Sequence, residues 1–182
     1  IFKFITEVSK FKPHFCISGG EPLLHPNIIE IIKHVKKNGM ICTMTTNGTL
    51  CDEKTILKII HSGLDSITFS IDGGEEIHDT YRGKGNFQKT ITCLKNLIRE
   101  RERSSFPQTR ITSVINNINY LRREEILELA RQYQVNTVTF NHMDYKTSTW
   151  IGRAKNQFTD IFNCPPRMTG FVTDSCKFEL DA

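Results

Sequence analysis

One segment decides the fold class: residues 14–26, which read HFCISGGEPLLHP. Its first part, residues 14–18, is a short apolar run that ends at Gly19-Gly20, and this pattern predicts a strand followed by a turn. Just downstream, residues 28–35 carry isoleucine and valine at helical spacing. The segment therefore opens a unit made of a strand, a turn and a helix.

The same unit recurs along the chain. Further strands are predicted at residues 40–46, 66–71, 110–115 and 137–141, with segments of helical period between them. This alternation is typical of parallel strands joined by crossover helices, so we predict an α/β fold, either a barrel or an open parallel sheet. Residues 73–86 form an extra loop in this scheme. Residues 1–11 predict a helix that precedes the first visible strand, which implies a further strand upstream.

The composition favours one globular domain, because 38% of the 182 residues are hydrophobic and 24% are charged. Lys and Arg exceed Asp and Glu by only 24 to 20, and they are scattered rather than clustered. We therefore expect no nucleic-acid partner. No apolar run approaches the roughly 18 residues of a membrane span, and no signal peptide is evident, so we expect no membrane partner and a cytoplasmic location.

The six cysteines show neither a CxxC motif nor close pairing. This spacing indicates no zinc knuckle and no disulfide framework, and it suits a reducing compartment. Cys16 and Cys42 fall within predicted strands, where we expect small buried apolar side chains rather than ligands.

Polar residues follow every predicted strand. They are Ser18-Gly19-Gly20-Glu21-Pro22, Thr45-Thr46-Asn47-Gly48, Ser70-Ile71-Asp72-Gly73, Asn116-Asn117 and Asn141-His142-Met143-Asp144. The carboxyl ends of parallel strands meet at one edge, where α/β proteins bind their ligands. A bound polar molecule would satisfy these groups, although Asn47-Gly48 and Asp72-Gly73 taken singly are also common turn dipeptides.

The string from Ile17 to Pro26, ISGGEPLLHP, resembles the GGEP segment of the radical S-adenosylmethionine (SAM) superfamily. The resemblance continues in order through residues 46–50 (TNGTL), 70–73 (SIDG) and 81–87 (YRGKGNF), and it covers about Ile1 to Asp144. It is closest to the branch of molybdenum-cofactor biosynthesis proteins and peptide-modifying enzymes with auxiliary clusters. It implies a partial (β/α) TIM-like barrel that lacks its first strand.

The resemblance also implies which residues bind the cofactor SAM. Gly19 and Gly20 would let the backbone approach the methionine ammonium, and Glu21 would offer it a carboxylate. Ser70 and Arg82 would hold the methionine carboxylate, for which a guanidinium is well shaped. The full predicted set is Ser18, Gly19, Gly20, Glu21, Pro22, Asn47, Ser70, Asp72, Arg82 and Asn117, with Asp72 and Asn117 assigned to the ribose or the substrate.

The sequence departs from the family pattern in one respect, because it contains no CxxxCxxC motif to hold a [4Fe–4S] cluster. We expect the cluster ligands upstream of Ile1, with a degenerate homologue as the alternative. Residues 1–145 would form the radical SAM core, and residues 146–182 an extension or the start of an auxiliary-cluster region. Cys164 and Cys176 are the candidates for that auxiliary cluster, and a plain cysteine-containing tail is the alternative.

The function that the resemblance implies is an enzyme that generates a 5′-deoxyadenosyl radical and abstracts hydrogen from a peptide or a cofactor precursor. A flavodoxin or ferredoxin would be the reductant. Two alternatives stay open: a cluster-free SAM-binding or scaffold homologue, and a metal-dependent barrel hydrolase or lyase. The second would use Glu21, Asp72, His142 and Asp144.

Overall fold

The computed structural model of the chain describes residues 1–101, 106–115 and 119–142. Five strands form one sheet: β1 (Phe15–Ile17), β2 (Cys42–Thr46), β3 (Ser66–Ser70), β4 (Gln108–Ile115) and β5 (Thr137–His142). The helices are α1 (Phe2–Val8), α2 (Ile28–Lys37), α3 (Glu53–His61), α4 (Glu75–Arg82), α5 (Asn86–Glu100) and α6 (Arg123–Gln132), with short 3₁₀ turns η1 (Ser9–Phe11) and η2 (Pro22–Leu24). The chain divides into the unit Ile1–Met143 and the unit Asp144–Ala182.

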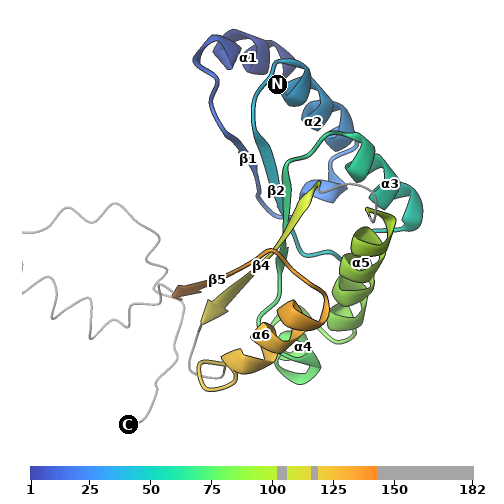
Figure 1. Cartoon of the computed structure of the whole chain (residues 1–182), viewed down its shortest axis with the longest axis vertical. Coiled ribbons are helices and arrows are strands. Elements are labelled where there is room, and N and C mark those ends of the chain that lie inside the picture. The colour runs from blue at the N-terminus through green and yellow to red at the C-terminus, as the bar shows by residue number, and fades with distance from the viewer. Residues whose placement is uncertain (102–105, 116–118, 143–182) are drawn as a thin grey trace, which may run out of the picture. The chain divides into compact units, whose positions relative to one another are not determined.

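All four neighbouring strand pairs are parallel, and the strand order in space is the order along the chain. The helices that connect the strands lie on one side of the sheet (Figure 1). Each predicted strand is present, with ends that differ by at most two residues from the predicted ones. The predicted α/β fold with parallel strands is therefore confirmed.

The helix-covered face of the sheet forms the core. Met44, Ile67, Phe69 and Ile111 point to this face and are at most 1% exposed. They belong to one apolar cluster that also includes Ile32 and Val35 of α2, Ile56 and Ile59 of α3, and Leu94 and Leu97 of α5. The alternate positions carry Thr43, Thr45, Thr68 and Thr112, which are only partly buried. This division of faces leaves the polar face and the carboxyl edge for ligand chemistry.

The segment predicted as a loop at residues 73–86 contains helix α4. That prediction was wrong because α4 buries few apolar side chains, of which Ile77 is the clearest. The helix is fixed largely by polar contacts instead. The backbone N–H of Gly74 donates to Glu125 of α6 at 2.8 Å, and the side chain of Asp79 accepts from the N–H groups of Gly85 and Phe87, at 2.5 and 2.8 Å. Asp79 thereby caps the start of α5.

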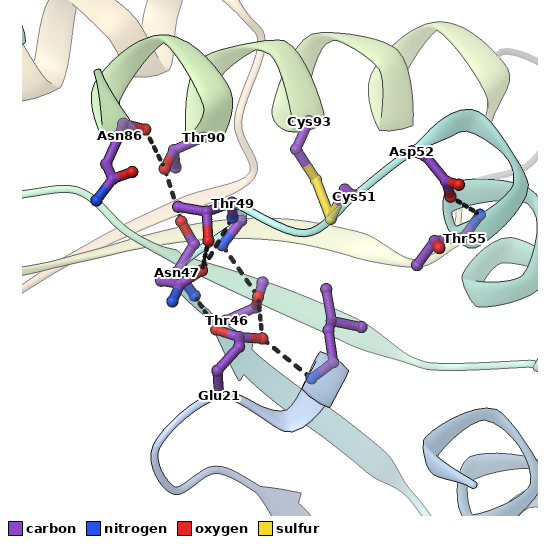
Figure 2. Close-up of a disulfide and its surroundings, with 12 residues drawn as sticks. Glu21, Thr46, Asn47, Thr49, Cys51, Asp52, Thr55, Asn86, Thr90 and Cys93 are labelled. Carbon is purple, nitrogen blue, oxygen red and sulfur yellow. Dashed lines mark hydrogen bonds between the residues drawn. A yellow bond between two sulfur atoms is a disulfide. The ribbon is translucent and has the colours of Figure 1, made fainter. Parts of the chain in front are cut away.

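Cys51 and Cys93 form a disulfide, with their Cα atoms 5.4 Å apart. The bond joins the segment between β2 and α3 to the middle of α5 (Figure 2). The expectation of unpaired cysteines is wrong for these two, because 42 residues separate them and only the fold brings them together. Cys42 is buried as expected, whereas Cys16 is exposed.

Several predictions fall outside the described residues. They concern Asn117, Asp144, Cys164, Cys176, the side chain of His142 and the region 146–182. Among the helices that the structure does describe, none is long and apolar enough to cross a membrane.

Candidate functional site

The candidate site lies at the carboxyl edge of the sheet, where the turns after β1, β2 and β3 meet. Parallel pairing sets this arrangement, because Ile17 pairs with Met44, Thr46 pairs with Phe69, and Ser70 pairs with Thr112. The residues that follow each strand therefore lie at the same edge. The site is built from these turns and from helix α4.

The turn after β1 is open to a ligand. Ser18, Gly19 and Gly20 are exposed, and Gly19 has a φ of +136°, which favours glycine. A Cβ atom built on either glycine would meet no protein atom within 4 Å. The backbone at this corner consequently borders free space, as the predicted approach to an ammonium group requires. Pro22 is buried in η2 and shapes the turn instead.

The side-chain carboxylate of Glu21 accepts hydrogen bonds from neighbouring segments of the protein (Figure 2). Its Oε1 accepts from Thr46 Oγ1 at 2.7 Å and from the backbone N–H of Leu23 at 3.1 Å, and its Oε2 accepts from the N–H of Asn47 at 2.7 Å. The carboxylate thus joins the turn after β1 to the end of β2. The sequence predicted that this carboxylate binds the SAM ammonium. The structure shows that the carboxylate accepts three hydrogen bonds from the protein itself.

Asn47 shapes the loop after β2. Its Oδ1 accepts from both the N–H and the hydroxyl of Thr49, at 2.9 and 2.8 Å. Its backbone carbonyl accepts from Thr90 Oγ1 of α5 at 2.6 Å (Figure 2). Gly48 follows with a φ of +72°, and an added Cβ would lie 3.1 Å from Phe69 and from Thr90. The loop is therefore packed closely against β3 and α5.

Asp72 and Arg82 form an ion pair just beyond β3. Asp72 Oδ2 accepts from Arg82 Nε at 2.6 Å, and Oδ1 accepts from the backbone N–H of Val114 at 2.9 Å. The side chain of Asp72 is 6% exposed and that of Arg82 is 30% exposed. Ser70 lies two residues before Asp72 and is partly exposed, and its hydroxyl has no hydrogen-bond partner among residues 1–101, 106–115 and 119–142.

His78 lies buried behind this ion pair. Its Nδ1 accepts from the backbone N–H of Asp72 at 3.4 Å, and its ring packs edge-on against Phe87. Burial lowers the pKa of His78, and the nearby Arg82 lowers that pKa further. The imidazole is therefore neutral near pH 7.

The structure brings most predicted site residues to one edge of the sheet, but these residues differ in whether they are already bound within the protein. Gly19, Gly20 and Ser70 remain available to a ligand, whereas Glu21, Asn47 and Asp72 make hydrogen bonds within the protein. Arg82 does both, because its Nε donates to Asp72 while its side chain stays 30% exposed. Sequence reasoning missed three supporting residues, which are His78, Thr90 and Asn119. Thr46 was part of the predicted polar segment after the second strand, and the structure shows that it supports Glu21. Asn119 could have been found from the sequence, because it is a polar residue that follows the strand predicted at residues 110–115.

Within the described ranges, no group of three His, Cys, Asp or Glu residues is arranged to hold a metal ion. Cys42 is unsuited to ligation as well, since burial raises the pKa of its thiol to about 12. The described residues therefore do not provide the ligands of an iron-sulfur cluster.

The fold defines the class: an α/β protein of parallel βα units. Proteins of this class bind their ligands at the carboxyl ends of the strands. The chain belongs to the radical SAM superfamily, whose family model matches residues 1–133. Membership implies SAM and a [4Fe–4S] cluster as cofactors. The parallel sheet is accordingly part of a partial TIM-like barrel.

The chain is similar to several characterised proteins. It is 33% identical over 132 residues to the AdoMet-dependent heme synthase of Methanosarcina barkeri, covering 71% of the chain and 36% of that protein. It is 29% identical over 141 residues to the PqqA peptide cyclase of Gluconobacter oxydans, covering 77% and 38%. The chain thus spans less than half the length of these relatives.

The same fold occurs in SuiB of Streptococcus suis, whose crystal structure contains bound SAM. The TM-score is 0.69 at 15% identity, and the match covers 89% of this chain and 40% of SuiB. At this identity the likeness concerns the fold.

Proposed function

We propose that the chain is the SAM-binding core of a radical SAM enzyme that abstracts hydrogen from a peptide or a cofactor precursor. The observation that carries this proposal is the open turn at Gly19-Gly20, beside which no protein atom occupies the space of a side chain. Family membership supplies the identity of the ligand. Bound SAM supplies the 5′-deoxyadenosyl group used by this family.

The residues at the edge divide the binding of SAM between them. The backbone at Gly19 and Gly20 accepts the methionine ammonium, since carbonyl groups at this turn can come close to a ligand. Ser70 and Arg82 take the methionine carboxylate, with the guanidinium supplying charge-assisted hydrogen bonds. Glu21 holds the turn after β1 in place through Thr46 and Asn47.

The cluster ligands of the proposed enzyme lie outside the part of the chain that the structure describes. Cys16 is a single exposed thiol on β1, and the only other described free cysteine is the buried Cys42. Neither position gives the closely spaced thiolates that a cluster needs. We derive no chemical step through the cluster from these residues.

The nature of the substrate is proposed from the relatives. One relative is named a heme synthase and another a peptide cyclase, which supports a cofactor precursor or a peptide as the substrate class. We also propose a flavodoxin or ferredoxin as the electron donor and a cytoplasmic location, where the reducing medium would keep Cys51 and Cys93 largely in the thiol form. Asn117 is proposed to contact the ribose or the substrate, and Cys164 and Cys176 are the candidate ligands of an auxiliary cluster.

The metal-dependent hydrolase alternative is not favoured. Both oxygens of Glu21 and both oxygens of Asp72 already accept hydrogen bonds from the protein. A divalent ion would have to compete with these donors for the same carboxylate oxygens. The family match also leaves no reason to prefer this alternative.

The test uses the full-length protein, reconstituted with iron and sulfide without oxygen. We expect SAM binding with release of 5′-deoxyadenosine on reduction, and we expect Arg82→Ala to weaken SAM binding by about tenfold to a hundredfold. Arg131→Ala is the matched control, because Arg131 pairs with Glu124 on the exposed side of α6. A protein that binds zinc or manganese instead of iron and sulfide, or one that binds no SAM, would contradict the proposal.

A further inference from the structure

The carboxylate of Asp72 is enclosed by protein. Asp72 is 4% exposed, and its two oxygens accept from Arg82 Nε at 2.6 Å and from the N–H of Val114 at 2.9 Å. One partner is charged and the other belongs to β4, so the carboxylate joins helix α4 to the sheet. With the residue only 4% exposed, little of the carboxylate surface is left for a ribose hydroxyl.

The backbone of Asp72 is fixed as well. Its carbonyl accepts from Asn119 Nδ2 at 2.9 Å, and the same amide group donates to the carbonyl of Val114 at 2.9 Å. On the other side, the N–H of Asp72 donates to His78 Nδ1 at 3.4 Å. Contacts from three directions therefore hold the residue in one position.

Arg82 receives its orientation from this fixed carboxylate. Over residues 1–101, 106–115 and 119–142, the hydrogen bond to Asp72 is the only one that the Arg82 side chain makes. This bond uses Nε, so the terminal N–H groups of the guanidinium remain for another acceptor. The side chain is 30% exposed at the ligand edge.

We propose that Asp72 is a positioning residue, which orients the Arg82 guanidinium toward a carboxylate ligand and does not itself contact SAM. The inference rests on the proposed function, in which that ligand is the methionine carboxylate. Arginine has many rotamers, and fixing it before the ligand arrives reduces the entropy lost on binding. The earlier prediction that Asp72 contacts the ribose or substrate is replaced by this role.

A double-mutant cycle tests the inference in the full-length, cluster-containing protein. The dissociation constant for SAM is measured by equilibrium dialysis for the wild type, Asp72→Asn, Arg82→Ala and the double variant. We expect Asp72→Asn to weaken binding about tenfold. In the Arg82→Ala background, the same change should have no further effect, because Asp72 acts through Arg82. Additive losses would show direct contact with SAM and would overturn the inference.

The chain offers a closely matched control in Asp65, at the opposite edge of the sheet. Asp65 Oδ2 accepts from Lys36 Nζ at 2.5 Å and from the N–H of Cys42 at 2.7 Å, so it also joins a cation to a strand amide. Asp65→Asn should lower thermal stability and leave the dissociation constant for SAM unchanged. An equal loss of SAM affinity in this control would overturn the positioning role. Failure of the wild type to bind SAM would contradict the proposed function itself.

Discussion

The carboxylate of Glu21 accepts a hydrogen bond from the backbone N–H of Asn47 at 2.7 Å, and this bond joins the turns after two neighbouring strands. The two residues are 26 positions apart in the sequence. Thr46 Oγ1 and the N–H of Leu23 complete the contacts of the same carboxylate. The glutamate of the GGEP segment is thus a structural link between β1 and β2 at the ligand edge.

Glu21→Gln tests this link. Glutamine has one acceptor oxygen in place of the carboxylate pair, so an amide NH₂ group must face the backbone N–H of either Leu23 or Asn47. We expect the free energy of unfolding to fall by about 1–3 kcal/mol, measured by urea denaturation. Glu30→Gln is the control, because among the described residues Glu30 pairs only with the exposed Lys33. Equal stability of both variants would contradict a structural role for Glu21.

Gly20→Ala separates ligand binding from folding. An added Cβ at Gly20 meets no protein atom within 4 Å, so the thermal midpoint should stay near that of the wild type. The methyl group would occupy space assigned to the methionine end of SAM, so SAM binding to the full-length protein should weaken about tenfold or more. Unchanged SAM affinity would place the ligand elsewhere.

For Gly73→Ala we expect the opposite effect on stability, because here an added side chain has no free space. Its added Cβ would lie 2.8 Å from both Cβ and Cγ2 of Ile77, the buried apolar residue of α4. Relieving that overlap requires α4 to move, which we expect to cost about 1–3 kcal/mol of stability. Urea denaturation measures this loss. A Gly73→Ala variant as stable as Gly20→Ala would show that α4 adjusts without cost.

The disulfide between Cys51 and Cys93 should stabilise the fold. It closes a loop across a sequence separation of 42 residues, for which chain entropy predicts a contribution of about 4 kcal/mol. We expect reductant to lower the urea midpoint of the wild type and to have no effect on the Cys51→Ser, Cys93→Ser double variant. Cys16→Ser, which changes an exposed free thiol, should respond to reductant as the wild type does.

How much the sequence alone could predict depends on the range of the interaction. The strands were predictable because apolar runs and turn residues are local, and Gly39, with a φ of +68°, follows the end of α2 as a local pattern would indicate. Helix α4 was not predictable in this way, because contacts of Gly74 and Asp79 with distant or backbone groups fix it.

The candidate site shows the same limit. The motif identified Glu21, Asp72 and Arg82 as important, but only the register of the sheet shows which donors reach each carboxylate. Asp72 meets Val114, which lies 42 residues away, through the pairing of β3 with β4. Residue identities therefore predicted a polar edge, and the three-dimensional arrangement shows which of its side chains are bound within the protein.

The final prediction concerns His78 and acid pH. Burial, and then the nearby Arg82, lower the pKa of His78 in the folded protein from the model-peptide value of 6.5. An unfolded chain therefore binds a proton on His78 at a pH where the folded chain does not, and stability falls as the pH decreases from about 6.5 through the lowered pKa. Asp72 and Asp79 oppose this effect without reversing it.

The measurement is the free energy of unfolding at pH about 7.5 and about 5.5, before and after His78→Gln. The wild type should lose stability between these values, and His78→Gln should lose less, although its stability at the higher pH is reduced by the altered packing against Phe87. His61→Gln, a change at an exposed residue of α3, should keep the wild-type dependence on pH. Asp79, whose pKa is lowered by hydrogen bonds from Phe87 and Gly85, acts at more acid pH and does not obscure the comparison. Identical pH dependence of the wild type and His78→Gln would contradict a lowered pKa of His78 in the folded protein.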